Sequence, residues 1–321
     1  VVAIKTMALA QEFEGDELDD ARERFFREAE TAGRLQHQHI VTIFDAGEEH
    51  DLAYIAMEFL KGRDLADFCR DGNLLPPAQV LSIVARVAEA LAYAHRQNVV
   101  HRDIKPANIM YERDSDTVKV TDFGIARITD ASKTRTGLVL GTPSFMSPEQ
   151  IAGKKVDGRS DLYSLGVMLY QMLTGVLPFR GDSMAELMYK IANEAAPDLR
   201  VPRPQLPQRL AQVVARALAK KPDLRYQDGD EFARDLRAAA GELAGPAAPA
   251  GGASAPASDA ADDERTVAFR AAPATDAAGQ PVMGADNALA PNGPAAGQPG
   301  YDAVQKDGLP GQAGQEPSRE L

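Results

Sequence analysis

The chain has 321 residues, of which 35 are basic and 47 acidic, giving a formal net charge of -12. An acidic balance argues against a nucleic-acid-binding protein, which would present a basic face. The lone cysteine, Cys69, excludes an internal disulfide and indicates a reducing, cytoplasmic compartment. The longest apolar stretch, residues 163–177, is shorter than the roughly 20 residues of a membrane span, so we expect no membrane segment.

The composition changes near residue 240. Residues 1 to about 240 mix apolar periodic runs with charges of both signs and are long enough to bury a large core. Residues 241–321 are rich in Ala, Pro and Gly, and carry 11 acidic and 4 basic side chains. Such a stretch cannot bury enough apolar area to offset its conformational entropy. We therefore expect a disordered tail over residues 241–321.

The first elements are short strands around one helix. Residues 1–5 form an apolar strand, and after an acidic linker a helix is expected from about Leu18 to Leu35, where apolar residues recur at helical spacing. Two more strands, residues 41–46 and 53–58, flank a predicted turn at residues 47–51.

Long helices follow from Pro77, a residue that suits a first helical turn. Two brief strands are expected at residues 109–111 and 117–121, and helices over residues 160–173, 183–193, 207–220 and 228–240. The pattern predicts an α+β fold. Its small strand-rich lobe spans residues 1–60, its larger helical lobe spans residues 61–240, and a cleft lies between them.

A motif set accompanies this pattern. Residues 101–108 read His-Arg-Asp-Ile-Lys-Pro-Ala-Asn, followed by Asp-Phe-Gly at 122–124. Six fixed residues of the first block arise by chance in roughly one chain in 200,000, whereas Asp-Phe-Gly alone arises in roughly 4%. Together with Val-Ala-Ile-Lys at 2–5 and Ser-Pro-Glu at 147–149, the order matches protein kinases. Over residues 1 to about 240 the chain resembles bacterial, eukaryotic-like (Hanks-type) serine/threonine protein kinases.

The resemblance implies a bilobal kinase fold and transfer of the γ-phosphate of ATP to protein Ser or Thr hydroxyls. Phosphoryl transfer needs mainly positioning and neutralisation of charge. By resemblance, Lys5 binds the α- and β-phosphates and is held by a carboxylate on the first helix. Glu28 is the preferred candidate, with Glu23 and Glu30 as alternatives on the same helix.

The central block supplies the remaining catalytic groups by resemblance. Asp103 accepts or orients the proton of the incoming hydroxyl, and Lys105 neutralises the γ-phosphate. Asn108 and Asp122 offer hard oxygen ligands for Mg²⁺, or for Mn²⁺ in its place. Thr142 is similar to the family's threonine that contacts the catalytic aspartate and receives the substrate residue.

The adenine ring is expected against residues 57–60. By resemblance, the backbone carbonyl of Glu58 and the amide of Leu60 bond the ring edge. Met57 closes the back of the pocket, although a methionine at a strand end is otherwise plain core. Ala3 and Met110 cover the two faces of the ring.

Arg102 is similar to the arginine of kinases that are activated by phosphate on the following loop. Thr134 and Thr136 lie where related bacterial kinases phosphorylate themselves, and each phosphate would add about −1.5 to −2 charges that could dock on Arg102. The alternative is that these threonines are ordinary polar loop residues.

Two further matches are expected to support the fold. Glu149 should pair with Arg225, and Asp161 should bond the backbone of the catalytic block from the start of a buried helix.

In the tail, acidic residues precede Thr266, with Phe269 three residues further on. Phosphorylated Thr266 is a candidate ligand for a forkhead-associated-domain protein; the alternative is a polar linker.

The family's Gly-rich loop, which covers the phosphates, has no counterpart before Val1. We therefore expect a chain truncated before the lysine strand that binds ATP weakly and transfers phosphate poorly. Two other classes stay open. A pseudokinase acting as a scaffold would normally lack a metal or base residue, and a small-molecule phosphotransferase would lack the Gly-Thr-Pro and Ser-Pro-Glu elements.

Overall fold

The computed structural model describes residues 1–50, 52–70, 72–123 and 143–243. The chain divides into two units, residues 1–252 and 253–321, and the second lies wholly outside the described residues. The predicted tail therefore stays a prediction beyond residue 243. The first unit combines a small sheet and its helices with a larger, mainly helical portion, as the sequence predicts.

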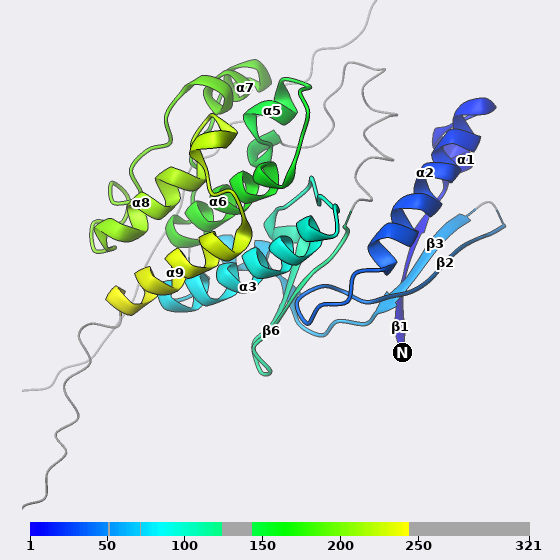
Figure 1. The fold of residues 1–321 in the computed structure, drawn as a ribbon, viewed down its shortest axis with the longest axis horizontal. Coiled ribbons are helices and arrows are strands. Elements are labelled where there is room, and N and C mark those ends of the chain that lie inside the picture. Colours follow the sequence, from blue (N-terminus) through cyan, green and yellow to red (C-terminus); the bar gives the residue numbers. More distant parts are fainter. Residues whose placement is uncertain (51, 71, 124–142, 244–321) are drawn as a thin grey trace, which may run out of the picture. The chain divides into compact units, whose positions relative to one another are not determined.

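Three antiparallel strands form the first sheet, in the order β1-β3-β2 (Figure 1). They are β1 (Val2–Met7), β2 (Ile43–Glu49) and β3 (Leu52–Glu58). Residues alternate between the two faces of a strand, and Ile55 of β3 is 1% exposed. Lys5 pairs with Ile55, and Ala3 pairs with Met57. This register places all four side chains on the same, inner face of the sheet.

Two helices follow β1. The short α1 (Leu9–Glu12) was not predicted, because four residues are too few to show a helical period. Helix α2 (Asp16–Gly33) begins with acidic side chains, which suit the positive end of the helix dipole. Its buried residues share one stripe, in which Ala21, Phe25 and Ala29 cluster with Ile55, while Ala32 joins the larger core.

The predicted turn at residues 47–51 is wrong in its extent. Strand β2 continues through Glu49, and β3 resumes at Leu52. Gly47, which was predicted to be a turn residue, lies within β2. A glycine is needed at this position because a Cβ there would collide with the ring of Tyr54 on β3. The left-handed backbone of the turn instead falls on His50, at φ 51°.

A second small sheet, ordered β4-β5-β6, lies at the start of the helical portion. Strand β4 (Arg63–Asp64) was not predicted; β5 (Ile109–Glu112) and β6 (Thr117–Val120) match the two predicted strands. Val41 and His39, which follow α2, hydrogen-bond the backbone of Val120. The first sheet is thereby tied to the strand that leads into Asp122.

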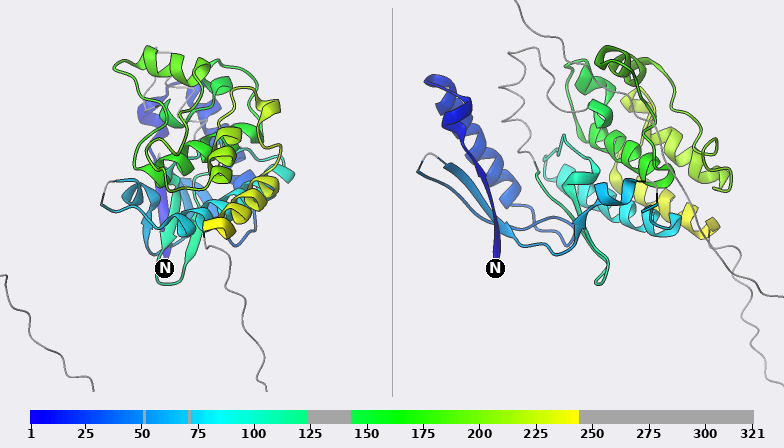
Figure 2. Two further views of the ribbon diagram at one scale, coloured as in Figure 1. Left: turned by 90° about the vertical axis from the view of Figure 1, so that its left-hand side faces the viewer. Right: turned by 180° about the vertical axis from the view of Figure 1, so that it is seen from behind.

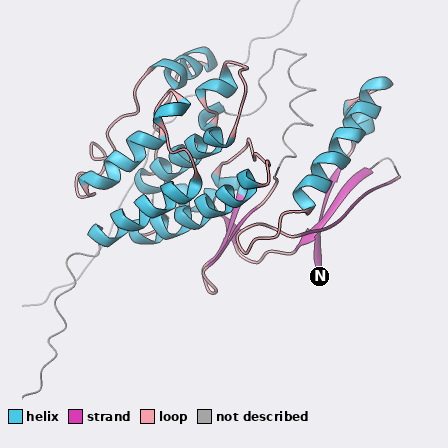
Figure 3. Cartoon of the chain, in the orientation of Figure 1, coloured by secondary structure: helices cyan, strands magenta, loops and turns pink. Residues whose placement is uncertain are grey.

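The larger portion is mainly helical among the residues described (Figure 3). Its helices are α3 (Pro77–Arg96), α5 (Pro148–Ile151), α6 (Gly158–Thr174), α7 (Met184–Asn193), α8 (Gln208–Ala217) and α9 (Gly229–Leu243). Helix α6 is buried along nearly its whole length, and α3 and α9 run side by side (Figure 2). Gly229 allows this approach, because a Cβ there would collide with the carbonyl of Ala88. Short 3₁₀ helices include η1 (Leu65–Cys69) and η2 (Pro106–Asn108).

Candidate active site

Lys5 and Asp122 come from different parts of the chain and meet as an ion pair. Lys5 lies on β1, and Asp122 follows the end of β6. The Lys5 Nζ atom donates to the Asp122 Oδ1 atom over 2.7 Å, and the two side chains are 41% and 28% exposed. Asp122 has φ 62°, a conformation that L-residues hold only where the surroundings impose it. The next residue, Phe123, is buried against the His101 ring, with centroids 4.6 Å apart.

The three carboxylates proposed as partners of Lys5 differ in burial. Glu28 is half-buried on α2, whereas Glu23 and Glu30 are exposed. Glu23 lies 3.7 Å from Arg27, and Glu30 pairs with Arg34, both within the helix. The inner position favours Glu28, as the sequence predicted. Its role as the lysine's partner stays a prediction.

The catalytic block, residues 101–108, brings together the side chains of Asp103, Lys105 and Asn108. The Lys105 Nζ atom donates to Asp103 Oδ2 over 2.6 Å. Asn108, which ends η2 and is 6% exposed, donates from Nδ2 to the Asp103 carbonyl over 2.7 Å and to its carboxylate over 3.0 Å. The carboxylate of Asp103 is thereby fixed by two neighbouring donors.

Asn108 and Asp122 lie on adjacent backbone segments. The backbone N–H and the hydroxyl of Thr121, the residue before Asp122, both donate to the Asn108 carbonyl, over 2.9 and 3.1 Å. Since Nδ2 of Asn108 is engaged with Asp103, its Oδ1 atom is the one suited to a cation. An amide and a carboxylate oxygen are the donors that Mg²⁺ prefers. Within the described ranges, no group of three or more His, Cys, Asp or Glu could hold a metal.

Asp161 supports the catalytic block as predicted. It lies in the first turn of α6, is 1% exposed, and accepts from the backbone N–H groups of His101 and Arg102 over 2.9 and 2.7 Å. The same carboxylate contacts the His95 ring at 2.8 Å. Arg102 has φ 70°, so this carboxylate holds a backbone that would otherwise relax.

The predicted pair of Glu149 and Arg225 is confirmed. It is bidentate, with N–O distances of 2.7 and 2.8 Å, and the side chains are 8% and 0% exposed. Burial alone would raise the pKa of Glu149. Hydrogen bonds from Arg225 and Ser160, with the guanidinium charge, outweigh burial and lower that pKa below its ordinary value.

A cavity of about 270 Å³ lies beside the segment that follows β3. Glu58, Leu60 and Met110, three of the residues expected to hold adenine, line it. The Glu58 carboxylate accepts a hydrogen bond from Lys119 over 2.7 Å, so this side chain already has a partner. Met57 lines a separate space of about 10 Å³ with Asp122 and Phe123, too small to admit a ligand.

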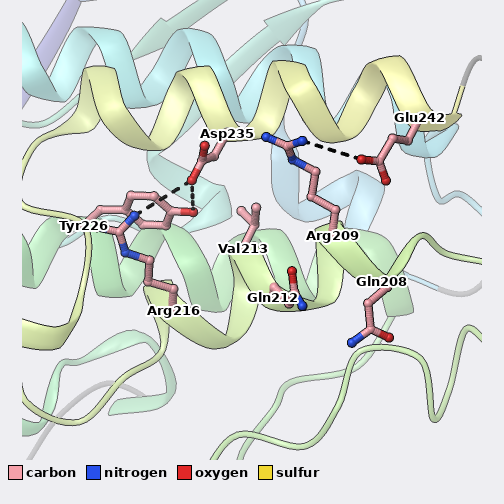
Figure 4. A pocket seen from close by; sticks show the side chains of 8 residues that line it. All are labelled: Gln208, Arg209, Gln212, Val213, Arg216, Tyr226, Asp235 and Glu242. Atoms are coloured by element: carbon pink, nitrogen blue, oxygen red, sulfur yellow. Dashed lines mark hydrogen bonds and ion pairs between the residues drawn. The ribbon is translucent and has the colours of Figure 1, made fainter.

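Another cavity, of about 550 Å³, lies between α8 and α9 (Figure 4). Its charged groups are engaged with one another. Asp235 accepts from the Tyr226 hydroxyl over 2.9 Å and lies 3.9 Å from Arg216, while Arg209 lies 3.6 Å from Glu242. It shares no lining residue with the cluster around Asp103.

The protein kinase domain model matches residues 1–234. The chain belongs to the protein kinase family. It is 42% identical over 222 residues to a probable serine/threonine-protein kinase of Streptomyces coelicolor, covering 67% of this chain and 33% of that protein. It is 38% identical over 217 residues to the serine/threonine-protein kinase PrkC of Bacillus subtilis, again covering 67% and 33%. The chain thus spans about a third of the length of these curated relatives.

The solved structures agree with the family. The kinase domain of PknI of Mycobacterium tuberculosis superposes with a TM-score of 0.60 at 33% identity, covering 74% of this chain and 85% of that one. The predicted α+β kinase fold is therefore confirmed. The relatives' names support the bacterial, Hanks-type serine/threonine branch.

Several predicted residues of this kinase chain lie outside the described residues: Thr134, Thr136, Thr142 and Thr266. Their roles stay predictions. Among the helices that are described, none is both long and apolar enough to cross a membrane.

One residue near the kinase site was missed. Gln150, on α5, donates from its amide to the carbonyl of Arg102 over 2.8 Å. The Ser-x-x-Gln spacing from Ser147 is a helix-capping signature, and the structure contains that capping box. The signature could have predicted the cap, but nothing in the spacing indicates the bond to a residue 48 positions away.

Proposed function

We propose that this kinase chain transfers the γ-phosphate of ATP to Ser and Thr hydroxyls of proteins, itself included, with Mg²⁺ as the metal ion. The observation that carries the proposal is the convergence of Asp103, Lys105, Asn108 and Asp122. Two hydrogen bonds from Thr121 to Asn108 join the two segments that bear them. A scaffold without activity needs no such convergence.

Asp103 accepts or orients the proton of the attacking hydroxyl. Its carboxylate accepts from Lys105 over 2.6 Å and from Asn108 over 3.0 Å, so its orientation is set before a hydroxyl binds. Lys105 carries a positive charge next to this carboxylate and stabilises negative charge on the group being transferred.

Lys5 orients the α- and β-phosphates, and Glu28 is the carboxylate that holds it during turnover. In the structure Lys5 contacts Asp122, and both side chains keep substantial exposure. An exposed ion pair is weak, so phosphate oxygens can replace the carboxylate at the ammonium group. The Asp122 carboxylate, freed from Lys5, would then be able to hold a metal ion together with Asn108.

Asn108 and Asp122 would hold Mg²⁺ together with the phosphates, and the ion would supply positive charge that neutralises the oxygens of the transferring group. Mn²⁺ has the same ligand preference and is a substitute. The backbone of Glu58 and Leu60 binds the adenine edge. The cavity beside these residues and Met110 supports that role. On the first sheet, Ala3 covers one face of the adenine ring and Met57 closes the back of the pocket.

Regulation is proposed at the segment after Phe123. Phosphates on Thr134 and Thr136 dock on Arg102, and Thr142 contacts Asp103 and the substrate residue. Phosphorylated Thr266 recruits a forkhead-associated-domain protein. We place the kinase in the cytoplasm, where the single, buried thiol of Cys69 stays reduced. The proposed lobes are residues 1–60 and 61–240.

Radiolabelled ATP tests the proposal. The full-length protein and its Asp103→Asn variant are each incubated with Mg²⁺ in two reactions, one with a generic basic protein as substrate and one without added substrate. We expect label on the basic protein and on the kinase itself, and about 100-fold to 10,000-fold less with Asp103→Asn. Phosphate mapping should find Thr134 or Thr136 labelled.

Equal labelling by the two proteins would contradict the role of Asp103. Absence of transfer from the parent, with ATP binding retained, would instead support a pseudokinase that acts as a scaffold.

A further inference from the structure

Gln150 connects the short helix α5 to the catalytic block. Its Nε2 atom donates to the carbonyl oxygen of Arg102 over 2.8 Å. Its Oε1 atom accepts from the backbone N–H and the hydroxyl of Ser147, over 2.9 and 3.0 Å. The two ends of one amide therefore do different things: the oxygen caps α5, and the nitrogen holds a carbonyl of another segment.

That carbonyl belongs to the peptide unit that joins Arg102 to Asp103. The nitrogen of the same peptide unit donates to the Nδ1 atom of His101 over 3.3 Å. One residue earlier, the N–H of Arg102 donates to Asp161 over 2.7 Å. The backbone leading into Asp103 is thus held by a side chain from α6 on one side and by Gln150 on the other.

The backbone conformation of Arg102 explains why the contacts from Asp161 and Gln150 matter. Arg102 has φ 70°, in the left-handed region that L-residues rarely adopt. Such a backbone persists only where its surroundings over-determine it. Rotation of the peptide unit would redirect the Cα–Cβ bond of Asp103 and move its carboxylate away from Lys105 and Asn108.

We propose that Gln150 is a positioning residue for phosphoryl transfer. It acts through the Arg102 carbonyl to keep the Asp103 carboxylate aimed, and it links α5 to the catalytic block. The inference rests on the proposed function of Asp103. A displacement of about 1 Å at a catalytic group can reduce a rate by about 100-fold, so one such bond has a measurable effect.

Two substitutions separate this role from simple helix capping. Gln150→Glu keeps an oxygen for the Ser147 N–H, and Glu is as good a capping-box residue as Gln. It loses the donor and opposes a carboxylate to the Arg102 carbonyl. Gln150→Met keeps the length and loses both functions. If the donor matters, both variants are impaired; if only the cap matters, Gln150→Met alone is impaired.

The control is Ser183→Ala, which removes an N-cap bond of 3.1 Å to the Glu186 N–H at the start of α7. It removes the cap of another helix, without touching the bond from Gln150 to the Arg102 carbonyl. The full-length protein and the three variants are compared by kcat and KM for ATP, by thermal unfolding, and by hydrogen exchange at the Asp103 amide.

We expect kcat to fall at least about tenfold in Gln150→Glu and Gln150→Met, with KM for ATP within about twofold. Ser183→Ala should keep kcat within about twofold at a temperature where it is folded. The Asp103 amide should exchange faster in both Gln150 variants than in Ser183→Ala.

A kcat within twofold of the parent in Gln150→Glu, with unchanged exchange at the Asp103 amide, would overturn the proposal and leave Gln150 a cap. If the parent itself transfers no phosphate, the proposed function fails. The exchange measurement then decides alone whether Gln150 holds the Asp103 backbone.

Discussion

Two ion pairs of this kinase, formed by residues far apart in the sequence, differ in almost every physical respect. Glu149 and Arg225 are buried, bidentate and joined by a further bond from Ser160. Lys5 and Asp122 meet through a single contact of 2.7 Å and are 41% and 28% exposed. The first pair cannot exchange partners without exposing a buried charge, whereas the second can do so at little expense. Permanent pairing suits a structural role, and an exchangeable pair suits a site that binds phosphates.

The largest expected effect is on folding. Arg225→Met leaves the Glu149 carboxylate buried without its guanidinium, and we expect the free energy of unfolding to fall by about 3–5 kcal/mol. Urea unfolding followed by circular dichroism measures it. Adding Glu149→Leu to Arg225→Met should restore much of the loss, because an apolar pair replaces an orphaned charge. A double variant less stable than Arg225→Met would contradict this account.

A substitution of the cation in the Lys5–Asp122 pair should behave in the opposite way. Lys5→Met should reduce kcat/KM by about 100-fold to 1,000-fold, because a cation is lost from the site of developing charge. Its free energy of unfolding should stay within about 1 kcal/mol of the parent, since the pair is exposed. Steady-state kinetics and urea unfolding are measured on the same preparations. A loss of stability as large as that of Arg225→Met would abolish the distinction between the pairs.

The buried pair should also give the protein a pH-dependent stability of smaller size. The pKa of Glu149 is lower in the folded chain than its ordinary value of about 4.3. The unfolded state therefore binds more protons, and the contribution of Glu149 is complete above that value and lost as the pH falls through the folded pKa. Urea unfolding between about pH 7 and about pH 3.5 should show a shallower decline in Glu149→Gln than in the parent. Equal slopes would exclude this source.

The smallest effect is expected at a pair with neither role. Arg22 on α2 lies 2.7 Å from Glu48 on β2, with side chains 30% and 23% exposed. Glu48→Gln should lower the free energy of unfolding by less than about 1 kcal/mol and leave kcat unchanged. Its loss should shrink further at high salt, because exposed charges are screened. A loss above 2 kcal/mol would show that exposure is a poor guide to the strength of these pairs.

The sequence predicted most of the site because kinase chemistry fixes residue types at fixed spacings. Asp103, Asn108 and Asp122 were identified by their motifs, and Glu149 with Arg225 by resemblance. The missed contacts have no local signature. Gln150 bonds a carbonyl 48 residues away, and any residue type offers that carbonyl. Likewise, the tyrosine ring that excludes a side chain at Gly47 comes from the neighbouring strand, so the glycine was mistaken for a turn residue.

The backbone bonds between the segment after α2 and β6 have a mechanical consequence. His39 and Val41 hydrogen-bond Val120, two residues before Asp122, so the chain is anchored shortly after Gly33, the last residue of α2. Glu28 lies about 8 Å along the helix axis from Gly33, and Asp16 about 26 Å, at 1.5 Å per residue. A tilt of α2 about its C-terminal end would move Glu28 by less than a third of the displacement at Asp16. The position of Glu28 along the helix would therefore change little even where the N-terminal end of α2 moved far.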